Sequence, residues 1–179
     1  DPARPRYHYD LHTAIRGSRH EKFAVSPFPH ERPHCKEQVR FLGACGVRTI
    51  LLSSGPTTTF SYYSSHQHGA HAFTVELGKV RPFGENDMTR FIEVRQTLQE
   101  LVPRDEVALE PWRAADFSRF LVASDVDNFT EFPQGFGLAE DGHRQYRVEK
   151  PREAVVFPNA NVAIGQRTML LVVPTRLWE

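Results

Sequence analysis

The alternation of polar and apolar side chains is clearest in residues 6–15, RYHYDLHTAI. Successive side chains on a β-strand point to opposite faces, so one face of such a strand carries His8, Asp10 and His12. The other face carries the apolar and aromatic positions Tyr7, Tyr9, Leu11 and Thr13. We therefore predict a strand over residues 6–13 that packs by one face and presents an ionisable face as a candidate site.

Hydrophobic patterns along the rest of the first hundred residues predict strands mixed with helices. Apolar runs predict further strands over residues 47–53 and 72–78, and residues 22–29 form a second short apolar stretch, which Pro27 and Pro29 break. Helical spacing predicts a helix over residues 33–46, with Pro33 in its first turn and Gly46 at its C-terminal cap. A second helix is predicted over residues 88–102, capped by Asn86 or Asp87, ended by Pro103, and with an apolar stripe of Met88, Phe91, Ile92, Leu98 and Leu101.

Two segments lack this clear periodicity. Residues 54–71 are rich in Ser, Thr and Gly, which predicts a long loop or a loosely helical connection. After residue 103, short strand-like pieces such as SRFLVAS, RQYRVEK, EAVVFP and TMLLVVP alternate with turn sequences. We therefore predict an α/β domain with a parallel or mixed sheet over residues 1–105 and a small β-rich domain over residues 106–179.

Composition narrows the class of partner. The 179 residues contain 22 Lys plus Arg and 22 Asp plus Glu, so no basic excess is available to bind nucleic acid. No apolar run approaches the length of a membrane span, and we expect a cytoplasmic protein with no membrane partner. The two cysteines, Cys35 and Cys45, match neither a disulfide framework nor a zinc knuckle, and we expect reduced packing residues. The chain begins at Asp1 with PARPR, from which we expect a part of a longer protein.

Nine histidines invite metal hypotheses. His34 and Glu37 match the H-x-x-E pair of zinc peptidases, in which one helical turn brings an imidazole and a carboxylate together. The pattern is short, and a solvent-exposed face in the first turn of the predicted helix is the favoured interpretation. His66, His68 and His71 are interpreted as loop histidines near a substrate pocket rather than as a metal site.

Two positions carry more information. On spacing alone, His12 beside Asp10 suits a metal ligand with a supporting carboxylate and a structural histidine equally well. Glu76 stands inside the strand sequence FTVEL, so it is either paired with a base such as Lys79 or Arg81 or held in a site where its pKa is useful. We favour the functional alternative, and the basic residues that follow both positions favour a small anionic ligand.

Three blocks of sequence, YDLHTAIRGSRHEKFAV, GAHAFTVELGKVRPFGEND and FPNANVAIGQR, resemble the succinylglutamate desuccinylases, in the aspartoacylase branch of the zinc carboxypeptidase-like family. The blocks occur in the expected order, and the similarity extends from about Tyr7 to about Pro174. The resemblance implies the C-terminal part of a zinc carboxypeptidase-like domain followed by a β-rich domain. It also implies a cytoplasmic hydrolase of arginine catabolism, with one zinc ion per complete subunit, that converts N2-succinyl-L-glutamate and water to succinate and L-glutamate.

The resemblance also assigns roles to single residues. His12 matches the family's third zinc ligand, in a D-L-H-T-type strand, and Glu76 matches its general base, in a V-E-L-G-type strand. Tyr62 matches a substrate-contacting tyrosine of aspartoacylase relatives, whereas His66 stands where those relatives carry an arginine. Further candidates for binding the carboxylates of the substrate are Arg16, Lys79 and Arg81.

The family's H-x-x-E pair precedes the D-L-H-T strand by many residues, whereas only eleven residues precede His12. His34 and Glu37 follow that strand and cannot inherit the role by position. We therefore expect a C-terminal fragment with one of three zinc ligands, which alone binds zinc weakly and is inactive. Two alternatives keep the same fold: an aspartoacylase-like deacylase of another N-acyl amino acid, and a metal-free binding module.

Overall fold

The computed structural model describes residues 4–104, 126–141, 144–159 and 169–175. These divide into two compact units, one formed by residues 4–13 and 22–104 and the other by residues 14–21 and the described residues after 125. The predicted boundary between residues 105 and 106 lies outside the described residues, as does the predicted strand SRFLVAS.

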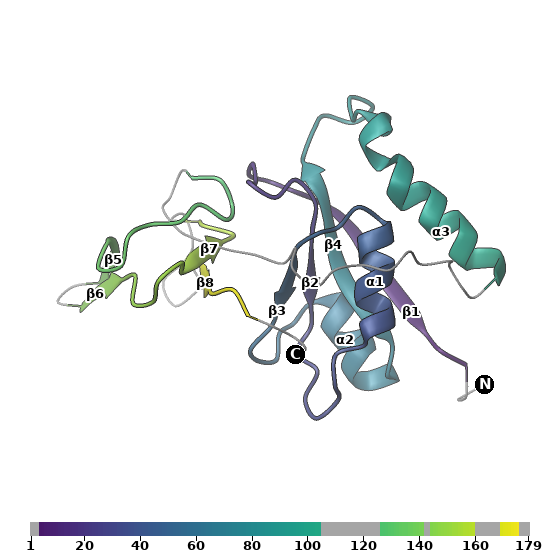
Figure 1. Cartoon of the computed structure of the whole chain (residues 1–179), viewed down its shortest axis with the longest axis horizontal. Helices are drawn as coiled ribbons and strands as arrows, with labels where there is room; N and C mark the ends of the chain where they lie inside the picture. The colour runs from purple at the N-terminus through teal and green to yellow at the C-terminus, as the bar shows by residue number, and fades with distance from the viewer. Residues whose placement is uncertain (1–3, 105–125, 142–143, 160–168, 176–179) are drawn as a thin grey trace. The chain divides into compact units, whose positions relative to one another are not determined.

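The first unit is built on a four-stranded mixed sheet in the order β1-β4-β2-β3 (Figure 1). Strand β2 runs parallel to β3 and antiparallel to β4, with Phe23 opposite Glu76 and Val25 opposite Thr74. The sheet confirms the predicted mixed α/β class. The strands are β1 (Tyr7–Ala14), β2 (Phe23–Ser26), β3 (Ile50–Leu52) and β4 (His71–Lys79).

Aromatic rings align β1 with β4. Tyr7 stacks on His71 with ring centroids 5.8 Å apart, and Tyr9 stacks on Phe73 at 6.4 Å. The two ring pairs advance in the same direction along both strands, which is the pattern of parallel neighbours. Tyr7 and Tyr9 of β1 therefore pack, as the alternation predicts, whereas Leu11 on the same face is exposed. The face that carries His8, Asp10 and His12 points the other way.

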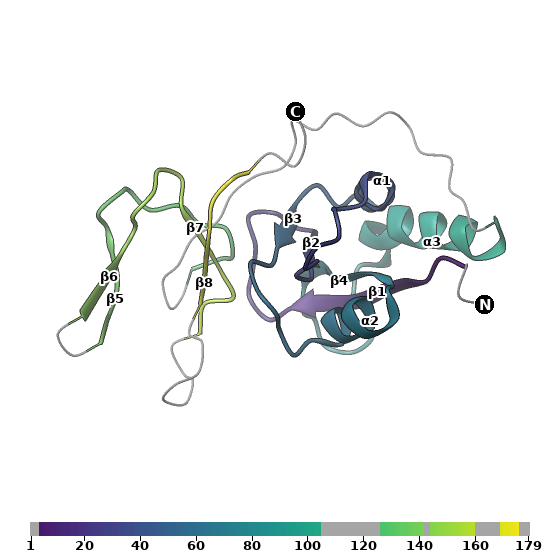
Figure 2. The same cartoon turned by 90° about the horizontal axis from the view of Figure 1, so that it is seen from below.

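Helices cover both faces of this sheet. Figure 2 shows α1 and α3 on one side of the strands and α2 on the other. Tyr9 lies against α1, because its ring stacks on Phe41 and its hydroxyl donates to Gln38. Thr97 of α3 donates to the Ala44 carbonyl at the end of α1. The bounds are α1 (Lys36–Ala44), α2 (Phe60–His68), the 3₁₀ turn η1 (Met88–Phe91) and α3 (Ile92–Arg104).

The structure corrects several details of the helix predictions. Helix α1 begins at Lys36, so His34 precedes the helix and is half-buried rather than on an exposed first turn. Helix α3 continues to Arg104, since a proline at 103 removes only one hydrogen bond in the last turn. The predicted stripe of α3 is also partly wrong, because Met88 and Ile92 are exposed whereas the buried residues are Val94 and Thr97.

Residues 60–68 form a regular helix, which agrees with the helical alternative of the two predictions for residues 54–71, a long loop or a loosely helical connection. Thr59 caps its N-terminus by accepting a hydrogen bond from the Tyr62 amide, and Gly69 ends it in the left-handed conformation. The buried residues of α2 are Ser61 and Ser65, so its inner face is hydroxyl-rich and shows no apolar stripe. A hydrophobic pattern could not reveal this helix.

The second unit contains short antiparallel pairs, as predicted for a β-rich domain. Strand β5 (Gly137–Asp141) pairs with β6 (Arg144–Arg147), and β7 (Ala154–Val156) pairs with β8 (Leu170–Val172). The side chains of Ala154, Val155 and Val156 are fully buried. Across the described residues of both units, no helix has the length and apolar character required to cross a bilayer.

Candidate active site

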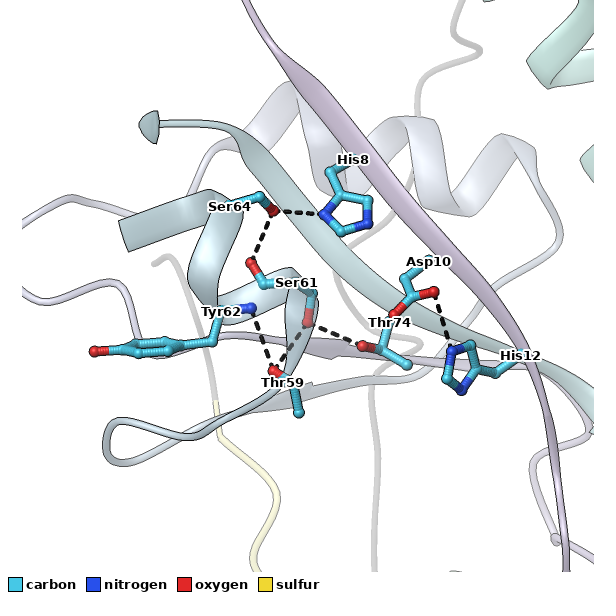
Figure 3. Close-up of polar contacts among 8 residues, drawn as sticks. All are labelled: His8, Asp10, His12, Thr59, Ser61, Tyr62, Ser64 and Thr74. Atoms are coloured by element: carbon cyan, nitrogen blue, oxygen red, sulfur yellow. Dashed lines mark hydrogen bonds and ion pairs between the residues drawn. The ribbon is translucent and has the colours of Figure 1, made fainter. Parts of the chain in front are cut away.

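The ionisable face of β1 meets one face of β4. The register of the stacked rings places Asp10 beside Thr74 and His12 beside Glu76, since each pair lies the same number of residues further along both strands. Both Asp10 and His12 act electrostatically on Glu76. The structure therefore brings together the two residues that the resemblance singles out, His12 and Glu76. Figure 3 shows Asp10 and His12 on one strand with Thr74 on its neighbour.

His12 is oriented by Asp10. Its Nε2 lies 3.0 Å from Asp10 Oδ1, and about half of the His12 side chain is exposed to solvent. A carboxylate only accepts hydrogen bonds, so this contact favours the tautomer with its proton on Nε2. The lone pair on Nδ1 is then free toward a ligand, which is the arrangement that a supporting carboxylate gives to a metal-binding imidazole.

Glu76 is the most unusual group of this face. The residue is 6% exposed, and its Oε2 has no hydrogen-bond partner among the described residues. Burial raises the pKa of Glu76, His12 lowers it and Asp10 raises it, with a net increase. Opposite it on β2 lies the fully buried ring of Phe23, which excludes water from that side. Its raised pKa makes this carboxylate a stronger base than an exposed glutamate.

The other candidate basic residues do not neutralise Glu76. Lys79 and Arg81 are exposed at the end of β4 and beyond it, and within residues 4–104 no ion pair joins Glu76 to a lysine or arginine. The ion-paired alternative for Glu76 is therefore not observed in the described part of the chain. Arg16 belongs to the second unit.

Tyr62 belongs to a different cluster. Its hydroxyl lies 3.0 Å from Nε2 of His30, and its ring stacks on His66 at 5.4 Å, while His66 stacks on His30 at 4.4 Å. Figure 3 shows the Tyr62 ring directed away from His12. Arg32 donates to the backbone carbonyl and hydroxyl of Ser65 in the same region. His30 and Arg32 were not predicted, because loop residues that meet a helix only in the folded chain leave no periodic signal.

Neither predicted histidine motif forms a metal centre. His34 is half-buried, which lowers its pKa, while Glu37 is exposed and accepts a hydrogen bond from the Cys35 thiol. His66 and His68 lie on α2 rather than in a loop. Among the described residues, no group of three His, Cys, Asp or Glu side chains is arranged to hold a metal ion.

Comparison with known protein families identifies the family of this chain. A family model described as the succinylglutamate desuccinylase/aspartoacylase catalytic domain matches residues 2–102, more than half of the chain. The chain belongs to the succinylglutamate desuccinylase/aspartoacylase family. A second model of the family, the AstE/AspA barrel-sandwich hybrid domain, matches residues 100–175. The two matches follow each other along the chain, in the predicted order of an α/β catalytic domain and a β-rich domain.

Curated relatives give the same result. The chain is 54% identical over 187 residues to the succinylglutamate desuccinylase of Pseudoalteromonas atlantica, with 96% of this chain and 53% of that protein covered. It is 49% identical to the succinylglutamate desuccinylase of Shewanella sp. strain MR-7, over 96% of this chain and 54% of the relative. The chain therefore spans about half the length of the curated relatives it matches.

Solved structures of family members share the fold. The succinylglutamate desuccinylase of Chromobacterium violaceum superimposes with a TM-score of 0.79 at 38% identity, covering 97% of this chain and 56% of that one. That of Vibrio parahaemolyticus gives the same TM-score and identity, with 97% and 54% covered. The strand arrangement that places His12 beside Glu76 therefore belongs to a known fold.

The described residues do not complete a zinc site. A catalytic zinc needs three protein ligands and an open position. His12 offers one imidazole nitrogen, and the described residues contain no cluster of three candidate ligands around it.

Proposed function

We propose that this chain supplies one part of the active site of an amide hydrolase that converts N2-succinyl-L-glutamate and water to succinate and L-glutamate. Family membership supports a hydrolase of this type. The observation that carries the proposal is the buried Glu76 carboxylate, whose Oε2 lacks a partner among the described residues. A buried acceptor without a partner costs about 1–3 kcal/mol of stability, and active sites are a common reason for such a cost.

Glu76 acts as the general base in this proposal. The carboxylate takes a proton from the water that attacks the scissile amide carbonyl, and the resulting acid then gives the proton to the departing amine of glutamate. Its raised pKa supports this role, because a stronger base accepts the proton of water more readily. Asp10 keeps the His12 ring in one orientation beside this carboxylate.

We include His12 as one of three zinc ligands, with Nδ1 as the ligating atom. The two remaining ligands then come from outside the described residues. Zinc, when bound in such a site, polarises a carbonyl oxygen. The same proposal includes a place in arginine catabolism in the cytoplasm, as the resemblance implies.

The substrate carries three carboxylates, which require cations. Lys79 is the last residue of β4, and Arg81 lies just beyond the strand. Both side chains are exposed and follow Glu76 closely in the sequence, so they are candidates to bind these carboxylates. Arg16 is retained as a third cation. Tyr62 is a further candidate to contact the substrate, and its hydroxyl would have to release its contact with His30 to do so.

A second candidate activity is that of an aspartoacylase, because the matching family model covers both enzymes. The two activities differ in the acyl group released and share the base. A metal-free binding module is the remaining alternative, and its prediction is that no amide is hydrolysed.

The experiment compares two proteins. One is the 179-residue chain, and the other, called the extended chain, joins it to the part of the Pseudoalteromonas atlantica relative that it does not cover. With zinc supplied, we expect the extended chain to release succinate from N2-succinyl-L-glutamate and to leave N-acetyl-L-aspartate unchanged. We expect the 179-residue chain to be inactive and to bind zinc weakly. Preferential turnover of N-acetyl-L-aspartate would replace the proposed substrate, and stoichiometric zinc in the 179-residue chain would contradict the incomplete site.

A further inference from the structure

Helix α2 lies over the face of the sheet that carries Asp10, His12 and Glu76, and it meets that face through hydroxyl groups. Ser61 and Ser65 are buried, and Ser64 is half-buried. An inner face of serines is an uncommon way to pack a helix, since apolar side chains normally fill that position. Burial of apolar area therefore does not explain how α2 is held on the sheet, and the hydrogen bonds of its serines do.

Two contacts connect α2 to both site-bearing strands (Figure 3). Ser61 Oγ lies 2.9 Å from Thr74 Oγ1 on β4, and Ser64 Oγ lies 2.5 Å from His8 Nδ1 on β1. Ser61 and Ser64 are three residues apart and so lie on one side of the helix. The helix thus bridges β1 and β4 directly.

Each contact is made two residues before a site residue. His8 precedes Asp10, and Thr74 precedes Glu76, in both cases on the same face of the strand. Within the first unit, β1 has one neighbour in the described sheet, β4. The two hydrogen bonds from α2 are therefore a second restraint on the position of β1 relative to β4.

Ser64 Oγ contacts two groups, His8 Nδ1 and, at 3.2 Å, the Ser61 carbonyl oxygen. Ser64 has a single hydroxyl hydrogen, and when that hydrogen points to the carbonyl, Oγ accepts from a hydrogen on His8 Nδ1. We expect this arrangement, and the tautomer of His8 tests it. The ring of Phe60 meets His8 edge-on at 4.6 Å and holds the imidazole plane.

We propose that His8, Ser61, Ser64 and Thr74 are positioning residues, which fix the register of β1 against β4 and so hold the Asp10–His12 pair beside Glu76. They act through the strands and touch no reacting atom. The proposal rests on the proposed function only for its kinetic consequence, because the geometric consequence concerns the folded chain alone.

The geometric test uses the 179-residue chain and long-range ¹H–¹⁵N spectra of its histidine rings. Thr74→Val removes the hydroxyl and keeps the shape of the side chain, whereas Thr74→Ser keeps the hydroxyl. Hydroxyl contacts continue from Thr74 through Ser61 and Thr59 to Thr57. Thr57→Val makes the same substitution at the far end of this series and serves as the control. We expect His12 ring signals to shift in Thr74→Val and Ser64→Ala and to stay in place in Thr74→Ser and Thr57→Val. His8 should carry its hydrogen on Nδ1.

The kinetic test uses the extended chain. We expect Thr74→Val to lower kcat by about tenfold to a hundredfold with KM nearly unchanged, since displaced catalytic groups slow the chemical step. Thr74→Ser should restore kcat. Ser61→Ala and Ser64→Ala remove the same bonds from the helix side and serve where Thr74→Val does not fold.

The outcomes separate the two proposals. His12 signals that coincide with those of the wild type in folded Thr74→Val and Ser64→Ala would overturn the positioning role, whatever the activity. An inactive wild-type extended chain with shifted His12 signals in the variants would overturn the proposed function and leave the positioning role standing. Equal losses of kcat in Thr74→Val and Thr57→Val would also contradict the positioning role.

Discussion

Glu76 combines two properties that oppose each other at the level of a single residue. Its burial opposite Phe23 makes the carboxylate a stronger base, and the same burial makes the charged form costly to the fold. His12 partly offsets that cost, and Asp10 adds to it. A residue selected only for stability would not be an acid at this position.

This conflict gives a prediction about stability. The pKa of Glu76 is raised in the folded chain, so its stabilising contribution is full below the unfolded pKa and is lost as pH rises through the folded pKa. In the 179-residue chain, Glu76→Gln should therefore melt at a higher temperature than the wild type at pH 8. The difference should shrink as the pH falls to about 4, near the ordinary pKa of glutamate.

Thermal unfolding followed by circular dichroism across this pH range provides the measurement. Glu85→Gln makes the same substitution at an exposed position and should leave the melting temperature unchanged. A wild type more stable than Glu76→Gln at pH 8 would mean that the carboxylate is paired rather than isolated.

At the scale of single elements, β1 and β4 follow from their sequences, whereas the sequence of α2 left a long loop and a loosely helical connection both open. The alternation of His8, Asp10 and His12 predicts the strand and its polar face directly, because side-chain direction has a period of two. Helix α2 hides its inner face behind serines, so the apolar periodicity that reveals a helix is missing. The cap at Thr59 and the left-handed Gly69 were the available signals.

The candidate site divides in the same way. Motifs single out His12 and Glu76, whose catalytic roles stay predictions, and the structure places these two residues on neighbouring strands. The cluster of Tyr62, His30 and His66 arises from contacts between a loop and a helix that are distant in the sequence. Such contacts depend on tertiary packing, which local patterns do not encode.

The end of α1 provides a prediction at the element scale. Gly46 has a φ of +75°, and a Cβ there would lie 2.0 Å from Glu93 Oε2, which pairs with Lys22 at 2.9 Å. Gly46→Ala should lower the free energy of unfolding by about 1–2 kcal/mol, since the left-handed conformation is costly for alanine. Gly55→Ala meets no atom within 4 Å and should change it by less than about 0.5 kcal/mol in denaturant titrations. Equal effects of the two substitutions would contradict the strained conformation.

At the scale of the whole molecule, the chain joins a catalytic family domain to a barrel-sandwich hybrid domain while spanning about half the length of its curated relatives. Its described residues place the buried Glu76 carboxylate beside the His12 imidazole, which Asp10 orients, without a three-ligand metal cluster. We propose that the chain contributes to an active site in which Glu76 moves the proton.

The most direct test of this account is the rate of succinate release from N2-succinyl-L-glutamate by the extended chain and its Glu76→Gln variant, with Glu85→Gln as the matched control. We predict that Glu76→Gln lowers kcat by about a hundredfold to ten-thousandfold, in the range typical of a lost general base, while Glu85→Gln keeps the wild-type rate. A Glu76→Gln variant as active as the wild type would contradict the assignment of Glu76 as the catalytic base.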